Sequence, residues 1–328
     1  MKLFVVKTLI INVFVLFVSH LHSQSAKITF TPQWMPQAQF AGYYVAQQMG
    51  FYKEAGLEVE IIHPSANIPA TDLLSSGKVD VISLFLITGM SAKNNGMDLV
   101  NIAQLSQHSA IFIVTKKSSG IDRLEKLKGK KIGVWKSGFD EVPKAMMKEK
   151  NYDVEWIPIL FSVNLFMLDG IDAMTVMSYN EYDNIINCGV NEDELNVFPI
   201  SDYGYDVPED GLYCLNATYN AKKEELKRFV EATFRGWEYA SANKTEAIDI
   251  VLDKMKAAHI PANRVHQNWM LDRVLEMMKG SNKSKDNGRV KKGELLETDF
   301  NHASKIFGNS SGNDLKYTFE EFYRPPNQ

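Results

Sequence analysis

The sequence contains little cysteine, no excess of positive charge and only one long apolar run. Its 328 residues include two cysteines, Cys188 and Cys214, too few for a disulfide framework or a four-cysteine zinc site. Their spacing leaves open whether they pair in an oxidising compartment. Lysine and arginine number 36 against 40 aspartate and glutamate, so the formal net charge is −4. Without a basic excess, nucleic-acid binding through phosphate contacts is not expected to be the main activity.

The one strongly apolar run lies at the N-terminus, at residues 9–18. A short basic segment precedes it and small polar residues follow it, which is the pattern of a secretory signal peptide. A run of that length spans only about half of a ~30 Å hydrocarbon core, so a membrane anchor is the weaker interpretation. We expect residues 1–25 to be a signal peptide cleaved between Ser23 and Ala26, and the mature protein to be exported to the periplasm.

The remaining sequence has ordinary globular composition, with 45% hydrophobic and 23% charged residues, and its length predicts two lobes. Short β-type runs alternate with short helices from residue 27 to 103 and again from 131 to 198, and the chain is mainly helical after 222. This alternation predicts an α/β fold with mostly parallel sheets covered by helices on both faces.

The two α/β units followed by a helical tail predict two doubly wound lobes around a cleft. If the tail packs on the first unit, the chain crosses between lobes near Thr115 and near Asp210. The expected division is therefore 26–115 plus 212–328 for lobe 1, and 116–211 for lobe 2.

Ligands of open α/β sheets bind beyond the carboxyl ends of the strands, so the loops after the strands hold the candidate site. Trp34 follows the first strand between two prolines that keep it outside regular structure. It offers a flat surface for stacking beside the hydrogen-bonding amides of Gln37 and Gln39. Phe40, Tyr43 and Phe85 are further candidate walls, with core packing as the alternative for each.

The second unit offers two candidate loops. Ser137 and Gly138 precede a predicted helix, where free backbone N–H groups bind anions. Asp140 and Glu141 follow them, and the alternative is that these acids simply cap the helix.

The second loop follows the strand at 171–177 and carries Tyr179, Asn180, Glu181 and Tyr182. Tyrosine stacks on rings, and a carboxylate can read an exocyclic amino group beside a protonated ring nitrogen through two parallel hydrogen bonds. The alternative is an N-cap asparagine with a first-turn glutamate that complements the helix dipole. Asp210, at the second crossing, is a further residue that could reach a ligand.

Several motifs resemble the periplasmic substrate-binding proteins for thiamine pyrimidine precursors and aliphatic sulfonates. The segments that carry the resemblance are KITF at 27–30, QWMP at 33–36, GYYVA at 42–46, GFYKEAGLEV at 50–59, DLLSSGKVD at 72–80, LKGKKIG at 127–133 and ATFRGWEYA at 232–240. SYNEY at 178–182 and EDGLY at 209–213 look more like the pyrimidine-precursor branch. The resemblance covers almost the whole mature chain.

The resemblance implies a type II periplasmic-binding fold with a hinged interlobe cleft. It also implies delivery of a small ligand, by a monomer without a cofactor, to the permease and ATPase of an ABC importer. The ligand expected from the candidate site is an aminopyrimidine precursor of thiamine. An aliphatic sulfonate held at the start of the helix after Gly138 is the alternative ligand.

A related branch is an enzyme, the hydroxymethylpyrimidine phosphate synthase, which consumes a histidine and bound pyridoxal phosphate. An ungapped reading places its lysine and histidine at Leu84 and Thr88, and leaves only Cys214 where its cysteine cluster would lie. That chemistry then lacks its starting groups, so a binding protein is favoured. His259 and His266, seven residues apart, are expected to form a surface pair rather than a metal site.

Overall fold

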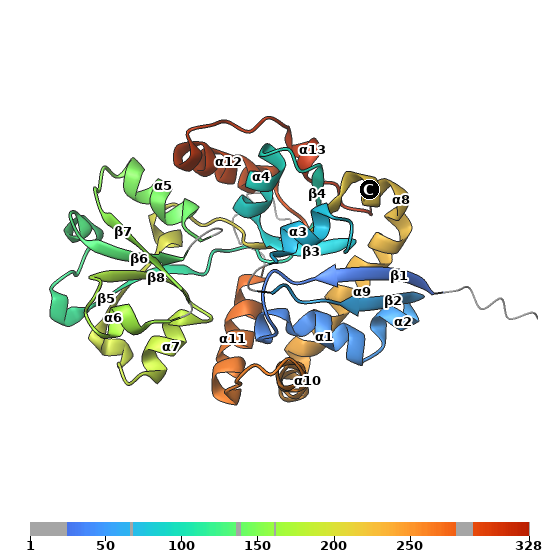
Figure 1. Ribbon diagram of the computed structural model, residues 1–328, viewed down its shortest axis with the longest axis horizontal. Coiled ribbons are helices and arrows are strands. Elements are labelled where there is room, and N and C mark those ends of the chain that lie inside the picture. The colour runs from blue at the N-terminus through green and yellow to red at the C-terminus, as the bar shows by residue number, and fades with distance from the viewer. Residues whose placement is uncertain (1–24, 66–67, 136–138, 161, 280–290, 328) are drawn as a thin grey trace, which may run out of the picture.

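The computed structural model describes residues 25–65, 68–135, 139–160, 162–279 and 291–327. Two five-stranded sheets lie side by side, with helices packed around each and a long helical C-terminal region (Figure 1). The helices have the following bounds: α1 Ala41–Gln48, α2 Phe51–Glu54, α3 Ala70–Ser75, α4 Leu86–Asn94, α5 Glu141–Glu149, α6 Asn164–Met167, α7 Glu181–Asn187, α8 Asn216–Ala221, α9 Lys223–Ala242, α10 Lys244–Ala257, α11 Arg264–Met277, α12 Glu297–Ser311 and α13 Phe319–Phe322.

The first sheet has the strand order β2-β1-β3-β10-β4. Its strands are β1 Ala26–Thr31, β2 Leu57–Ile61, β3 Val81–Phe85, β4 Leu99–Gln104 and β10 Asp210–Leu215. β1, β2 and β3 run parallel, whereas β10 runs antiparallel to β3 and β4. Leu57 and Val59 of β2 face the core while Glu58 and Glu60 face solvent, as the alternation in the sequence predicts.

The second sheet repeats this pattern in the order β7-β6-β8-β5-β9. Its strands are β5 Ile111–Lys116, β6 Lys131–Trp135, β7 Glu155–Ile159, β8 Ala173–Met177 and β9 Leu195–Pro199. β5 is antiparallel to both of its neighbours, as β10 is in the first sheet. Each sheet thus receives, in the same place, a strand that enters from the other lobe.

The expectation of mostly parallel sheets is therefore wrong in part, because both sheets are mixed. A strand that arrives directly from the opposite lobe enters from the cleft side, so it must run against the βα-connected strands. The strand Ile111–Lys116 already belongs to the second sheet, which moves the first crossing from Thr115 to residues 105–110. The second crossing is residues 200–209, and β10 begins directly after it.

Helix α9 packs against α1 across two glycines. A Cβ on Gly236 would lie 2.1 Å from the carbonyl oxygen of Gly42, so only glycine permits this approach of the two backbones. The indole of Trp237 covers Gly42 in the same way. On α9, Leu226, Val230 and Trp237 are buried, while Phe234 is only partly buried.

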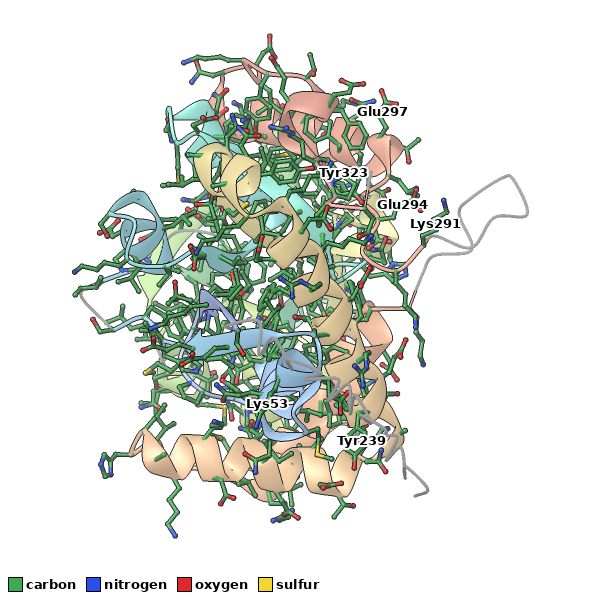
Figure 2. All side chains as sticks on the ribbon, turned by 90° about the vertical axis from the view of Figure 1, so that its right-hand side faces the viewer. Lys53, Tyr239, Lys291, Glu294, Glu297 and Tyr323 are labelled. Atoms are coloured by element: carbon green, nitrogen blue, oxygen red, sulfur yellow. The ribbon has the colours of Figure 1, made fainter. Side chains whose placement is uncertain are left out.

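The C-terminal residues cover the edge of the first sheet at β4. Tyr323 forms a bridge with Asn101, and its hydroxyl donates to the carbonyl of Gly293 at 3.0 Å. Gly293 in turn pairs with Gln104. Figure 2 shows Tyr323 close to Glu294 on this side of lobe 1. Burial raises the pKa of the Tyr323 phenol to about 12, and the covered β4 is buried along its whole length.

Two helices of the C-terminal region touch both lobes. α11 lies between α7 of lobe 2 and the α1 side of lobe 1, and α12 packs on α4 and α5 (Figure 1). α12 contributes Phe300 and Phe307 to the same apolar core as Met146 of α5. None of the described helices is long and apolar enough to cross a membrane.

The two cysteines do not pair. Cys188 is exposed at the end of α7 in lobe 2, and Cys214 is buried in β10 of lobe 1.

Candidate functional site

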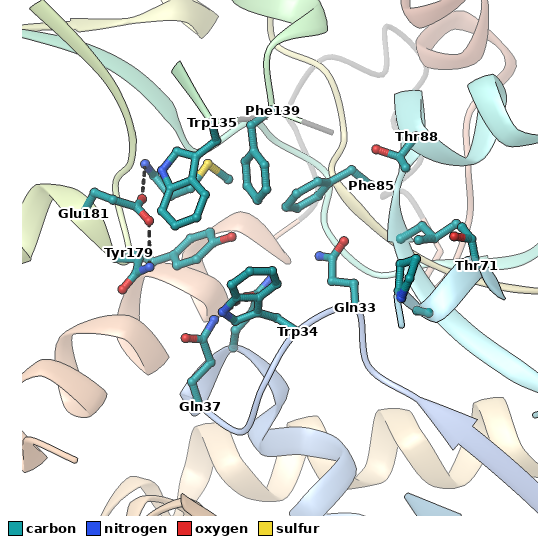
Figure 3. A pocket seen from close by; sticks show the side chains of 16 residues that line it. Gln33, Trp34, Gln37, Thr71, Phe85, Thr88, Trp135, Phe139, Tyr179 and Glu181 are labelled. Carbon is teal, nitrogen blue, oxygen red and sulfur yellow. Dashed lines mark hydrogen bonds between the residues drawn. The ribbon is translucent and has the colours of Figure 1, made fainter. Parts of the chain in front are cut away.

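A cavity of about 340 Å³ lies between the lobes (Figure 3). It opens where β1, β3, β6 and β8 end, which is where ligands of such sheets bind. Its lining residues are Gln33, Trp34, Gln37, Gln39, Pro69, Ala70, Thr71, Leu84, Phe85, Thr88, Trp135, Phe139, Met177, Tyr179, Asn180 and Glu181.

Aromatic side chains from both lobes meet in this cavity. The rings of Trp34 and Trp135 lie edge to face, with centroids 6.1 Å apart. Phe85 of lobe 1 contacts Phe139 of lobe 2 in the same manner, at 4.8 Å. Figure 3 shows Tyr179 on the same side of the cavity as Trp135 and Trp34. The cavity therefore presents flat apolar surfaces from both sides, suited to a planar ring.

Two glutamines of lobe 1 are held by a buried acid behind the cavity wall. Gln33 donates to one oxygen of Asp210, and Gln39 donates to the other at 3.1 Å. Burial raises the pKa of Asp210 to about 7, although both amide contacts favour the ionised form. Asp210 thus fixes which way these two amides present their remaining polar atoms to a ligand.

His63 holds the loop that carries Trp34. Its Nδ1 lies 2.7 Å from the carbonyl oxygen of Trp34, and its Nε2 lies 3.0 Å from the hydroxyl of Tyr44. A neutral ring with the proton on Nδ1 satisfies both contacts, because the tyrosine hydroxyl can donate to Nε2. Burial lowers the pKa of His63, which favours this neutral form.

Glu181 forms the acidic end of the cavity in lobe 2. Its Oε2 accepts from the backbone N–H of Met177 at 2.9 Å, and its Oε1 accepts from the Asn180 amide at 2.8 Å. Burial raises the pKa of this carboxyl, and the two hydrogen bonds partly oppose that effect. Each oxygen keeps acceptor capacity for a ligand, since a carboxylate offers about four lone-pair sites.

Three hydroxyl groups, those of Thr71, Thr88 and Tyr179, complete the polar lining. Burial, with Asp210 as the largest of the charges nearby, raises the pKa of Tyr179 well above its usual value, so its phenol stays protonated and can donate. The hydroxyl of Thr88 is buried and has no hydrogen-bond partner among the described residues.

The crossing segments are joined beside the cavity by Glu209. Its Oε1 accepts from the hydroxyl of Ser109 and from the N–H of Ala110, while Oε2 has no partner among the described residues. Burial and the neighbouring Asp210 raise the pKa of Glu209 to about 8, although the hydrogen bonds from Ala110 and Ser109 favour the ionised form. The second segment also contacts the first through Asp206, which accepts from Ser109 N–H at 3.0 Å.

Most of the residues predicted from the sequence line the cavity. They are Trp34, Gln37, Gln39, Phe85, Tyr179, Asn180 and Glu181. Leu84 and Thr88, where the lysine and histidine of the synthase branch were expected, also line it.

Four predicted residues lie elsewhere. Phe40 and Tyr43 pack in the core of lobe 1, because their face of the chain turns towards β1 and α9. Tyr182 points away from the cavity and contacts Phe112 and Trp269. Asp210 lies one layer behind, where it reaches a ligand only through Gln33 and Gln39. Ser137 and Gly138 lie outside the described residues.

Several site residues were missed in the sequence. Trp135 ends β6, and Gln33 and Phe139 lie, like Trp34, within four residues of the end of a strand, so the same positional argument could have found them. His266 is buried against lobe 2 and does not form a surface pair with the exposed His259, which corrects that expectation. No group of three His, Cys, Asp or Glu able to hold a metal occurs in the part of the chain that the structure describes.

Comparison with known proteins decides the family. The sequence model of the NMT1/THI5-like family matches residues 37–247, which is more than half of the chain. The chain belongs to the NMT1/THI5-like family. The resemblance noted in the motifs is thereby confirmed, and the lining residues described above, apart from Gln33 and Trp34, fall within the matched region.

Curated relatives of this NMT1/THI5-like protein include synthases and a binding protein. A 4-amino-5-hydroxymethyl-2-methylpyrimidine phosphate synthase of Saccharomyces cerevisiae is 36% identical over 108 residues, and the match spans only about a third of the length of either protein (33% of this chain, 32% of the relative). A formylaminopyrimidine-binding protein of Halalkalibacterium halodurans is 23% identical over 76% of this chain and 77% of its own length.

Solved structures establish the fold of this family member. The periplasmic aliphatic sulphonate binding protein of Escherichia coli superposes with a TM-score of 0.68 and 14% identity, covering 91% of this chain and 92% of its own. The expected periplasmic-binding-protein fold, an α/β fold of two lobes, is thus confirmed.

Proposed function

We propose that this protein is an exported solute-binding receptor for a small heteroaromatic of the aminopyrimidine type, a precursor of thiamine. The observation that carries the proposal is the lining of the interlobe cavity. Aromatic rings from both lobes flank one carboxylate, that of Glu181, and no lysine, arginine or histidine occurs among the described lining residues. Such a site favours a planar ligand that donates hydrogen bonds, or a cationic one, over an anion.

An aminopyrimidine matches these groups one by one. Its ring stacks on Trp34 and Tyr179, a contact worth roughly 1–3 kcal/mol per ring by analogy with nucleobases. Its amino group and adjacent ring nitrogen, when protonated, present two donors to Glu181. A cavity of about 340 Å³ is at the small end of the range for ligand sites, which suits a single substituted ring. The amides of Gln33 and Gln37 remain for the ring substituent.

The cavity supports a receptor rather than the synthase. Leu84 and Thr88 line it at the places where the resemblance expects the pyridoxal-binding lysine and the consumed histidine. Leucine and threonine can form neither a Schiff base nor the pyrimidine nitrogens, so these two positions cannot supply the groups that the reaction consumes. The named binding protein among the relatives also supports the receptor assignment.

Delivery to an importer belongs to the same proposal. The fold is shared with proteins named as ligand-binding components of ABC import systems, including one from Staphylococcus aureus. We infer that the protein is released into the periplasm by cleavage between Ser23 and Ala26, and that as a monomer it presents its ligand to a permease and its ATPase.

Calorimetry of the mature protein tests the ligand class. We expect formylaminopyrimidine and 4-amino-5-hydroxymethyl-2-methylpyrimidine to bind and taurine not to bind. Native mass spectrometry of freshly purified protein would identify a co-purified ring. Tight binding of taurine without either pyrimidine would contradict the proposal in favour of the sulfonate. An absorbance change typical of a Schiff base upon addition of pyridoxal phosphate would revive the synthase.

The variant Glu181→Gln tests the recognition of the amino group. Because the amide replaces one acceptor oxygen by a donor, aminopyrimidines should lose affinity by about tenfold or more, the scale of a charge-assisted hydrogen bond. Pyrimidines without the amino group should be affected less. An equal loss for every ligand would show that the substitution disturbs the fold of this loop instead.

A further inference from the structure

Helix α11 contacts both walls of the cavity although none of its residues lines it. On one side, Gln267 accepts from the N–H of Ala38 at 2.7 Å, which supports the short turn that carries Gln39. On the other side, Trp269 donates from its indole N–H to the carbonyl of Ser178 in lobe 2, at 2.8 Å. α11 is therefore a mechanical link between the two halves of the site (Figure 1).

His266 makes the most specific contact of this link. Its Nδ1 lies 2.5 Å from Oδ2 of Asp183, and its Nε2 lies 3.1 Å from Oδ1 of Asn180, both belonging to α7 and its cap in lobe 2. His266 and Asp183 are buried, at 9% and 5% exposure, so neither contact is replaced by water. Asn180 also lines the cavity.

The direction of the hydrogen bonds determines the form of His266 that fits. Asn180 donates its amide to Glu181, and its Oδ1 accepts from the side chain of Asn184 at 3.4 Å. Its Oδ1 thus faces Nε2 of His266, while a carboxylate oxygen of Asp183 faces Nδ1. Both neighbours are acceptors, so both ring nitrogens must carry protons for the two contacts to be hydrogen bonds.

Loss of the proton on Nε2 would act on the cavity through Asn180. The lone pair of Nε2 would then face the lone pairs of Oδ1, unless the amide of Asn180 turned over. Turning it over would take its N–H from Glu181 and present an oxygen to that carboxylate instead. The protonation of His266 is thereby coupled to the geometry of the acid that faces the ligand.

We propose that His266 is the positioning residue that couples lobe closure to the orientation of Asn180 and Glu181 in the cavity, and that it does so in its doubly protonated form. The proposal rests on the proposed function for its ligand, though not for the contact between the lobes. An apparent affinity is the intrinsic affinity reduced by the fraction of molecules in the competent form, so weakening this contact weakens binding without removing any ligand contact.

Few other charges lie around His266. From α7 the facing groups are Asp183 and, through Asn180, Glu181. The turn Ala38–Phe40, which also packs on α11, contains no titratable residue. On the α10 side, Arg264 pairs with Asp249, an exposed ion pair, and Lys244 of α10 pairs with Asp272 of α11, also exposed.

Calorimetry of formylaminopyrimidine with wild type and with His266→Gln tests the coupling. The variant should bind about tenfold more weakly than wild type, because the amide does not place donors at both Asp183 and Asn180 as the two ring nitrogens do. An unchanged affinity would overturn the proposal.

Arg264→Gln is the matched control. It removes an exposed ion pair from the same helix, on the side facing α10, so it should leave the affinity unchanged. If His266→Gln does not fold, Asp183→Asn provides a second test, because it keeps an acceptor for Nδ1 and removes the charge. Its affinity should be lower than that of wild type, because the charge-assisted hydrogen bond to His266 is lost; an affinity equal to that of wild type would contradict the proposal.

A measurement without ligand separates this proposal from the proposed function. Spin labels on the exposed Cys188 of lobe 2 and on a cysteine replacing the exposed Lys256 of α10 report the distance between the lobes. We expect a longer or broader distance distribution in His266→Gln than in wild type. If the distances change in this way but no pyrimidine binds, the proposed ligand is refuted and the role of His266 is supported. An unchanged distribution would refute the role of His266.

Discussion

The two walls of the cavity are supported in different ways. In lobe 1, Trp34 is held by His63, and Gln33 and Gln39 are held by Asp210, which begins β10 directly after the second crossing from lobe 2. In lobe 2, Glu181 is held by its own neighbours within four residues. The first wall therefore depends on the complete assembly of its lobe, whereas the second is built locally and joins the rest through α11. Preorganisation of the site is concentrated in lobe 1.

Substitution of Asp210, which holds both Gln33 and Gln39, should have the largest effect and should disturb the wall of lobe 1 alone. Asp210→Ala leaves the amides of Gln33 and Gln39 without their acceptor in a buried place. At about 1–3 kcal/mol for each unsatisfied group, we expect a loss of roughly 2–6 kcal/mol in the free energy of unfolding, together with the loss of ligand binding. Urea denaturation and calorimetry measure the two effects.

Asp210→Asn serves as the control for this variant. Its amide oxygen still accepts from one glutamine, so it should retain part of both stability and affinity. Equal behaviour of the alanine and asparagine variants would show that the anchor does not act through these hydrogen bonds.

The dependence of the free energy of unfolding on pH tests the role of Glu209, which joins the two crossing segments. The pKa of Glu209 is raised to about 8, so between about pH 4.5 and 8 the folded state holds a proton that the unfolded state has released. Stability must then fall as the pH rises through this window, by an amount on the order of a few kcal/mol. Glu209→Gln should reduce that fall in urea denaturation at pH 5 and 8. The pKa of Asp210 is also raised, to about 7, so Asp210 should preserve part of this fall in the variant. A steeper fall in the variant would refute the assignment.

Removal of one aromatic ring from each wall compares the contributions of the two lobes to stacking on the ligand. Trp34→Ala should weaken pyrimidine binding by about 5–150-fold, equivalent to roughly 1–3 kcal/mol, with little change in melting temperature. Trp135→Ala removes the facing ring of lobe 2 and should have an effect of the same size. Calorimetry of both variants measures the share of each lobe. Unchanged affinity in Trp34→Ala would remove that residue from the site.

Loss of the hydrogen bond between His63 and the carbonyl of Trp34 should have the smallest effect on ligand affinity. His63→Ala removes one hydrogen bond to a backbone carbonyl, worth about 0.5–1.5 kcal/mol, and frees the loop that carries the indole. We expect a loss of affinity of about 2–10-fold and a faster dissociation in stopped-flow fluorescence. A loss as large as that of Trp34→Ala would mean that the loop collapses without the histidine.

The sequence predicts the parts of this site that depend on local position. Trp34, Asn180 and Glu181 line the cavity because they follow strands at their carboxyl ends, a rule that needs no tertiary contact. Phe40 and Tyr43 were placed wrongly, because an aromatic residue at the start of a helix can face either the cleft or the core. Only the packing of α9 on α1 decides between these faces.

Long-range features could not be predicted in the same way. The strand Ile111–Lys116 is absent from the expected elements, and its antiparallel place in the second sheet depends on which lobe it enters. His266 gave no local signal either, since its partners Asp183 and Asn180 lie more than 80 residues earlier in the chain. Only the assembled molecule shows that contact.

The exchange of strands between the sheets has a consequence for the order of folding. All strands of the second sheet lie between residues 111 and 199, so a chain emerging from the ribosome can complete that sheet early. The first sheet cannot close until β10 has been synthesised and inserted between β3 and β4. The four strands between residues 26 and 104 therefore remain an incomplete sheet until β10, which ends at Leu215, exists, when nearly two thirds of the polypeptide have been made.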